Sequence, residues 1–138
     1  MPHTAPRRAD PLDDPREAAR RAPVWTALSN LFVGSVLDEV DYRSIADALA
    51  ASGYSLEELD RVLRDEVAPV FATNLSLSPT PEMLGWSDEG VRELVLAHLR
   101  RQRHPWRTWV PTGWLRDRQV ALVADRWAEV RRRLAGGA

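Results

Sequence analysis

Apolar side chains recur every three or four residues along most of this chain, and this spacing is the strongest constraint on its fold. Side chains spaced in this way share one face of an α-helix, whereas a half-buried strand needs strict alternation of apolar and polar residues. No segment shows such alternation. The pattern therefore predicts an all-α protein with no sheet.

Capping residues, prolines and glycines divide this pattern into six helical segments. A serine or aspartate before an apolar run caps a helix, and a proline suits the first helical turn. Ser55 and Glu58 match a capping box, Asp14 stands directly before Pro15 as a cap, and Asp41 and Ser87 precede similar runs. We expect helices near 15–22, 24–34, 41–52, 56–72, 88–103 and 114–134.

Prolines also set expected boundaries. Pro23 is expected to open the second helix, and Pro69 to kink the fourth helix or to end it near Val67. Residues 1–12 hold three prolines and almost no large apolar side chain, so we expect a disordered N-terminal arm there. The remaining length favours a single helical domain over 13–135, a compact bundle of five to six helices.

Short blocks in the first half of the chain resemble an uncharacterised family of small bacterial helical proteins. The blocks are PVWTALSNLF at 23–32, YRSIADALAASGYSLEELDRVLRDEVAPV at 42–70, and Asn74-Leu75. Together they span about residues 20–76. The resemblance implies a helical fold in a bacterial cytoplasm, and it implies no activity.

Two residue types are missing, and their absence removes many enzyme mechanisms. The 138 residues include no cysteine, and all 19 basic residues are arginine. Thiolate metal sites, cysteine nucleophiles, Schiff-base lysines and the lysine of a phosphate-binding loop are therefore excluded. The chain also has no Gly-x-Ser-x-Gly turn and no glycine-rich phosphate loop. We expect no catalytic residue, no cofactor and no metal.

Histidines and carboxylates suggest structural roles. His98 and His104 are six residues apart and do not share a helical face, so a helix-edge histidine bonded to a neighbour is favoured over a metal site. Adjacent acids point about 100° apart on a helix and do not converge on one substrate atom. Glu66 is expected to accept hydrogen bonds from Tyr42 or Arg43.

Charge is unevenly distributed along the chain, although the net charge is only −1. Residues 38–66 hold nine acids and three arginines, whereas residues 98–138 hold ten arginines and three acids. Like charges gathered in one half repel one another. We therefore expect part of the acidic surface to face part of the basic surface, within the molecule or between copies.

The segment 98–116 combines five arginines, two histidines and three tryptophans with no acid. Three interpretations remain open for it: arginines at a helix end beside a small loop core, the anchors of a protein interface, or a surface for phosphates and bases. An isoelectric point near 6.3 counts against nucleic acid. The candidate partner-binding residues are Arg100, Arg103, Trp106, Arg107 and Trp109.

By elimination, the sequence favours a non-enzymatic module that binds another protein, as a regulator or an immunity-type inhibitor. A nucleic-acid-binding protein that uses residues 98–116 is the alternative, and an enzyme of unrecognised type comes third. No signal peptide and no apolar run of about 18 residues is visible, so we expect a cytoplasmic protein with no membrane partner. The partner and the oligomeric state stay open.

Overall fold

The chain folds into a bundle of helices, which confirms the all-α prediction. The computed structural model describes residues 8–33, 36–76, 87–103 and 113–136, and these contain no strand. The helices are α1 (Pro15–Ser29), α2 (Glu39–Ala51), α3 (Leu56–Val62), α4 (Ala68–Ser76), α5 (Asp88–Gln102), α6 (Gly113–Ala121) and α7 (Ala124–Gly136), with a 3-10 turn η1 (Asn30–Phe32) and a π segment η2 (Leu63–Val67). Because α3, η2 and α4 form one continuous helix, the described residues make six helices, within the expected five to six.

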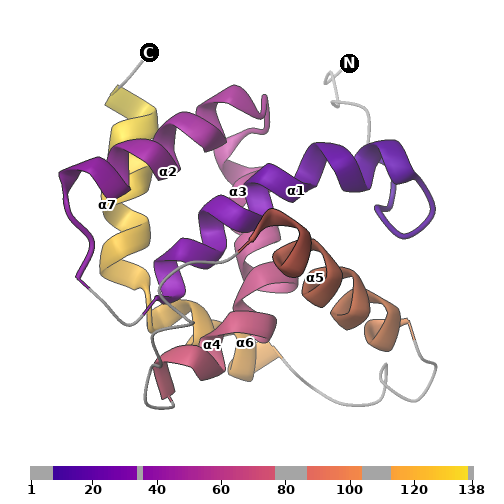
Figure 1. Cartoon of the computed structure of the whole chain (residues 1–138). Coiled ribbons are helices and arrows are strands. Elements are labelled where there is room, and N and C mark those ends of the chain that lie inside the picture. Colours follow the sequence, from indigo (N-terminus) through magenta and orange to yellow (C-terminus); the bar gives the residue numbers. More distant parts are fainter. Residues whose placement is uncertain (1–7, 34–35, 77–86, 104–112, 137–138) are drawn as a thin grey trace, which may run out of the picture.

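Helix α1 lies near the centre of the bundle (Figure 1). It packs against α2, α5 and η2, while α7 packs against α2 and α6 packs against α4 and η2. Its side chains Trp25 and Leu28 are fully buried in the core, beside Phe32 of η1. In the described part of the chain, no helix combines the length and the apolar character that crossing a membrane requires.

Helix α1 corrects the expectation that Pro23 opens a new helix. As predicted, Asp14 caps the helix by accepting a hydrogen bond from the N–H of Arg16. The helix then continues through Pro23, which is exposed. An internal proline costs about 3 kcal/mol. Full burial of side chains such as Trp25 and Leu28 stabilises the fold by about 1.5–3 kcal/mol each, enough to offset that cost.

Helix α2 begins two residues earlier than expected, because Asp38 and not Asp41 is its N-cap. The Asp38 carboxylate accepts from the Asp41 N–H at 2.8 Å, and the Asp41 carboxylate accepts from the Asp38 N–H at 3.0 Å. These two bonds form a capping box. The acid that the sequence suggested as the cap is the third helical residue of that box.

The single helix expected near 114–134 is in fact two helices, α6 and α7. The turn between them buries Val123 almost completely. One turn later, Arg126 donates hydrogen bonds to the carbonyls of Leu31 and Val33 at 2.9 and 2.8 Å. The break allows α6 to pack on α4 and α7 to pack on α2. Contacts distant in sequence therefore produce it, without a proline or a glycine.

Ion pairs join the acidic and basic parts of the chain within one molecule, which confirms that expectation. Arg133 of α7 donates to both carboxylate oxygens of Glu39 at the start of α2, at 2.6 and 2.7 Å. Arg116 of α6 donates to Asp65 of η2 at 2.9 Å. These pairs connect the C-terminal helices to the two helices that carry eight of the nine acids of residues 38–66.

The π segment carries the fourth predicted helix past Pro69. In η2 the N–H of Ala68 donates to the carbonyl of Leu63, five residues earlier. Pro69 has no N–H for the carbonyl of Asp65, its partner in regular helical spacing. The Nε2 atom of His98 lies 3.3 Å from that carbonyl oxygen. The imidazole of α5 therefore replaces the missing backbone donor when Nε2 carries the proton.

One of the two expectations for Pro69 was that it ends the helix near Val67. The contact between His98 and the carbonyl of Asp65 explains why the helix continues instead. The helix continues to the end of α4 because a side chain from another helix satisfies the carbonyl that proline leaves. It also confirms the structural role predicted for His98, a buried helix-edge histidine bonded to a neighbour. His104 lies outside the described residues.

We expect His98→Leu to lower the free energy of unfolding by about 1–3 kcal/mol, because the carbonyl of Asp65 loses its donor in a partly buried place. In a Pro69→Ala background the loss should be clearly smaller, since residue 69 then supplies an N–H to that carbonyl. Urea denaturation of the wild type, the two single variants and the double variant measures the coupling between His98 and Pro69. Equal losses in both backgrounds would show that His98 does not substitute for the backbone donor.

Candidate functional site: a charged cleft beside residues 8–14

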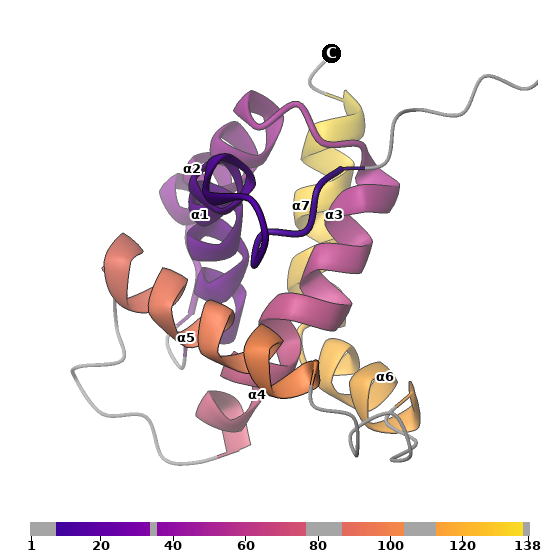
Figure 2. The same cartoon turned by 90° about the vertical axis from the view of Figure 1, so that its right-hand side faces the viewer.

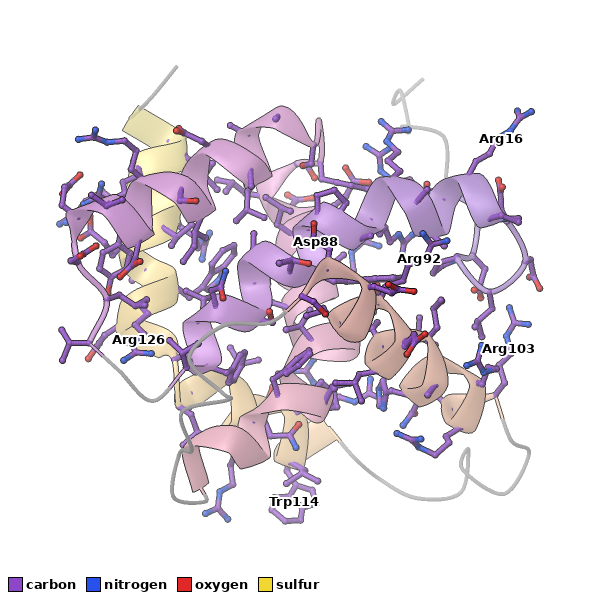
Figure 3. The ribbon with its side chains drawn as sticks, in the orientation of Figure 1. Arg16, Asp88, Arg92, Arg103, Trp114 and Arg126 are labelled. Atoms are coloured by element: carbon purple, nitrogen blue, oxygen red, sulfur yellow. The ribbon has the colours of Figure 1, made fainter. Side chains whose placement is uncertain are left out.

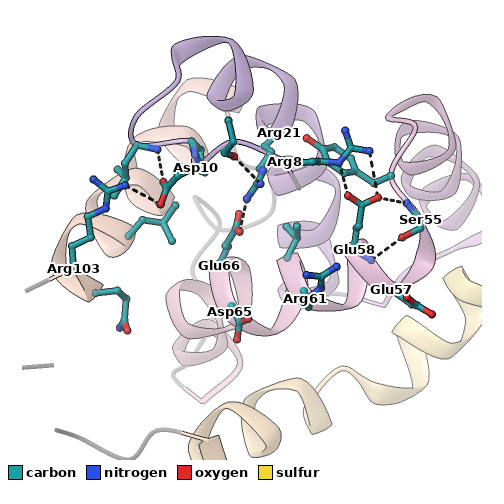
Figure 4. A pocket seen from close by; sticks show the side chains of 17 residues that line it. Arg8, Asp10, Arg21, Ser55, Glu57, Glu58, Arg61, Asp65, Glu66 and Arg103 are labelled. Carbon is teal, nitrogen blue, oxygen red and sulfur yellow. Dashed lines mark hydrogen bonds and ion pairs between the residues drawn. The ribbon is translucent and has the colours of Figure 1, made fainter. Parts of the chain in front are cut away.

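A cleft of about 900 Å³ opens between the N-terminal residues, α1, α3 with η2, and the end of α5 (Figure 4). Most of its lining is charged. The charged residues are Arg8, Asp10, Arg21, Glu57, Glu58, Arg61, Asp65, Glu66 and Arg103. Such a lining suits a polar, charged ligand better than an apolar small molecule.

One wall of the cleft is a buried polar network centred on Arg21. Its Nε donates to Glu17 at 2.5 Å, and its Nη1 donates to Glu66 at 2.6 Å. Each carboxylate has a second donor: the Tyr54 hydroxyl reaches Glu17 at 2.8 Å, and the Trp25 indole N–H reaches Glu66 at 2.8 Å. One guanidinium thus bridges two carboxylates, so the network has a net charge of −1 when both acids are ionised.

Glu66 corrects a further expectation, because its partners are Arg21 and Trp25 and not Tyr42 or Arg43. A π turn holds one more residue than an α turn, which rotates the side chains that follow by about 100°. Glu66 in η2 faces α1 as a result. Arg43 lies on the exposed side of α2, 3.7 Å from Glu39 in the previous turn.

Burial raises the pKa of Glu66 above its ordinary value, although Arg21 and Trp25 act in the opposite direction. Burial, together with the hydrogen bond to Glu17, raises the pKa of Tyr54 to about 12, so this hydroxyl remains a donor at neutral pH. A raised carboxyl pKa means that the folded state binds the proton more tightly than the unfolded state. The stability from Glu66 protonation is therefore present at low pH and is lost as the pH rises through its folded pKa.

The first charged residue beside the cleft, Arg8, lies between an aromatic ring and a carboxylate. Its guanidinium carbon is 4.0 Å from the centre of the Tyr54 ring, and its Nε donates to Glu58 at 2.5 Å. Its Nη2 also donates to the carbonyl of Gly53 at 3.4 Å. Gly53 has a φ of +78°, a conformation that favours glycine in the turn between α2 and α3. The hydrogen bond from Arg8 lowers the pKa of Glu58 below its ordinary value.

At the other end of the cleft, Arg103 holds two carboxylates of the N-terminal segment. It binds both oxygens of Asp13, at 3.0 and 2.9 Å, and contacts Asp10 at 2.8 Å. Burial works to raise the pKa of Asp10, but the hydrogen bonds from Arg103 and from the Leu12 N–H, together with the charges of Arg103 and Arg21, hold that pKa below its ordinary value. Between these points, Arg21 Nη2 donates to the carbonyl of Ala9 at 3.3 Å. Figure 2 shows this segment crossing between α3 and α1.

The structure describes two of the five residues that the sequence suggested for partner binding. Arg100 is exposed on the last turn of α5. Arg103 lies at the cleft, where Asp10 and Asp13 engage its guanidinium. The other candidates, Trp106, Arg107 and Trp109, lie outside the described residues. The structure therefore brings Arg103, but not Arg100, to the cleft.

Sequence reasoning singled out Glu66 but missed Glu17, Arg21 and Tyr54, which complete the wall of the cleft. Glu17 and Arg21 are four residues apart on one helix, a spacing that indicates an ion pair. That signal could have been found. The contribution of Tyr54 could not, because its hydroxyl meets Glu17 only when the turn before α3 packs against α1.

A family model described as "Domain of unknown function (DUF7079)" matches residues 19–133. The chain belongs to this family. The match confirms the expectation of an uncharacterised family and extends beyond the blocks at 20–76 into α7. Within the DUF7079 range lie Arg21, Glu66 and Arg103, whereas residues 8–14 precede it. The chain matches no curated protein and no solved structure.

We expect Arg21→Met in this DUF7079 chain to lower the free energy of unfolding by about 3–5 kcal/mol at about pH 7, because Glu17 and Glu66 then stay buried without a cation. Part of the loss should return at about pH 5, since protonation of Glu66 removes one buried charge. Denaturation at both pH values tests this. The matched control is Arg16→Met, an exposed position of the same helix. A loss that does not vary with pH would argue against two uncompensated carboxylates.

Proposed function

We propose that this protein is a non-enzymatic cytoplasmic module that binds another protein through the outward face of α6. A stripe of exposed side chains on this helix carries the proposal. Trp114 is 59% exposed, Leu115 is 42% exposed and Leu122, just beyond the helix end, is 51% exposed. Exposed apolar side chains gathered on one face are a feature of interaction sites.

Helical spacing brings these side chains together. Trp114, Arg118 and Leu122 follow one another at four-residue intervals, and Leu115 lies seven residues before Leu122, so all four share one face. The Arg118 guanidinium lies 5.9 Å from the centre of the Trp114 ring. Figure 3 shows Trp114 projecting away from the body of the molecule. Tryptophan and arginine are the residue types most enriched among interface hot spots.

The opposite face of α6 holds the helix on the bundle. Arg116 on that face donates to Asp65 at 2.9 Å and to Gln102 at 3.0 Å. Val120 packs against the core. The helix is therefore anchored by its inner face, and a partner can bind the outer stripe without disturbing that packing.

The sequence that leads into the stripe is basic, and this indicates what kind of partner fits. From residue 98 to residue 118 the chain has six arginines and one acid, Asp117, which pairs with Arg64. A protein surface with an apolar groove rimmed by carboxylates would complement such a stripe. Covering a partner's surface in this way is how a regulator or an immunity-type inhibitor acts, and both fit the proposal.

Nucleic acid remains the alternative ligand for residues 98–116, but the ion pairs favour a protein. Of the four arginines of this segment that the structure describes, two are engaged by carboxylates: Arg103 by Asp10 and Asp13, and Arg116 by Asp65. A guanidinium paired in this way has to exchange its carboxylate before it can bind a phosphate. A tryptophan beside leucines on a helix face also resembles a protein anchor more than a track for a nucleic-acid strand.

We expect Trp114→Ala to weaken binding to a protein partner by at least about 30-fold, the effect of removing a hot-spot side chain, while stability changes by less than about 0.5 kcal/mol. The partner is first recovered from native extract by cross-linking to the tagged chain, and its affinity is then measured with both proteins purified. The matched control is Val40→Ala, which truncates an apolar residue 69% exposed on α2.

Titration with a fluorescent single-stranded oligonucleotide at low and moderate salt provides the contrasting measurement. A protein-binding surface should show no affinity for it that depends on Trp114. Binding that Trp114→Ala removes and that falls steeply with salt would assign the stripe to nucleic acid instead. Equal partner affinity in the Trp114→Ala and Val40→Ala chains would exclude the stripe as the interface.

A further inference from the structure

Residues 8–13 contact the cleft as a bound peptide contacts its receptor. Residues 8–10 have no regular secondary structure, and residues 11–13 form a turn with Pro11 buried. Each part of the segment contacts a different element: Arg8 contacts α3, the Ala9 carbonyl contacts α1, and Asp10 contacts the residue that caps α5. Side chains and backbone are thus recognised together.

We propose that this cleft is a recognition groove for a short segment of a partner protein that carries arginine, any residue, aspartate and proline in that order. Residues 8–11 of this chain have that order and form one side of the cleft, where they contact α3, α1 and the end of α5 in cis. The site is separate from the outward face of α6, because neither Trp114 nor its neighbours in the stripe line the cleft. The inference therefore stands independently of the proposed function.

The groove has one subsite for a cation, and its parts suit a guanidinium. The Tyr54 ring offers an aromatic face, Glu58 a carboxylate and Gly53 a carbonyl, and Arg8 contacts all three. A planar guanidinium can stack on a ring while it donates in its own plane, which the compact ammonium of lysine cannot do. This subsite therefore selects arginine over lysine.

A second subsite for an anion lies at the far end of the groove. Arg103 binds carboxylates there, and Arg21 donates to the backbone carbonyl between the two subsites. The Arg21 side chain is itself fixed by Glu17 and Glu66, so this donor is in place before any segment binds. With the order of charges reversed, a segment would place an acid against Glu58 and a base against Arg103.

Residues 8–13 of the chain itself, the cis segment, are held in a way that allows a partner segment to replace them. Its ion pairs are partly exposed to solvent: the side chain of Arg8 is 21% exposed, and that of Asp13 is 68% exposed. Partly exposed ion pairs each contribute little to stability. The buried wall around Arg21 and Glu66 does not depend on them. A partner segment of the same charge order can therefore replace residues 8–13 at Glu58, Arg21 and Arg103.

The test uses the full-length chain and a fluorescein-labelled peptide that copies residues 6–13. The double variant Arg8→Ala/Asp10→Ala weakens the cis segment and leaves Tyr54, Glu58, Arg21 and Arg103 unchanged. We expect this variant to bind the peptide at least about tenfold more tightly than the wild type, in which the cis segment competes. Fluorescence anisotropy measures both affinities.

Two controls separate recognition from general charge attraction. A peptide with the arginine and aspartate at positions 8 and 10 exchanged has the same composition and should bind at least about tenfold more weakly. Adding Glu58→Gln to the double variant should also weaken binding, while glutamine preserves the capping box with Ser55. Absence of binding by the double variant, equal binding of the exchanged peptide, or no effect of Glu58→Gln would each overturn the proposal.

Discussion

The partly buried guanidinium of Arg21 holds helix α1 against the π segment η2. It lies between Glu17 on its own helix and Glu66 on the π segment, and each carboxylate accepts a further hydrogen bond from an aromatic residue. Buried charges are tolerated only when they are paired and fully hydrogen-bonded. The position of Tyr54 depends on the same network, and so does the ring against which Arg8 stacks.

The π segment η2 makes the contact between Glu66 and Arg21 possible. It places Glu66 toward α1 and the neighbouring Asp65 toward Arg116 of α6, so one helical turn joins two parts of the bundle. The same turn includes the carbonyl that Pro69 cannot bond and that His98 of α5 reaches. π segments occur often at functional sites, and here the segment forms part of the cleft.

The two proposed binding surfaces use arginine differently. On α6, Arg118 lies beside an exposed tryptophan at a surface that stays accessible. In the cleft, Arg21 and Arg103 are oriented by carboxylates, and one of these, Asp10, belongs to the N-terminal segment that forms one side of the cleft. A chain without lysine thus obtains both an adaptable interface anchor and fixed, geometrically selective donors from one residue type.

The sequence by itself determined the all-α class, the Asp14 cap of α1, the capping box at Ser55 and Glu58, and the pairing of acidic with basic segments, because periodicity, caps and charge act locally or in bulk. It also singled out Arg103 as a candidate partner-binding residue. Only the tertiary structure decided that helices continue through Pro23 and Pro69, that α6 separates from α7, and that Arg103 faces Asp10 and Asp13. The physical reason is that each of these outcomes depends on a partner distant in sequence. Core burial around Trp25 offsets the cost of Pro23, and the imidazole of His98 replaces the donor that Pro69 lacks. The carbonyls bound by Arg126 hold the turn between α6 and α7, and the segment that crosses the cleft provides the carboxylates for Arg103.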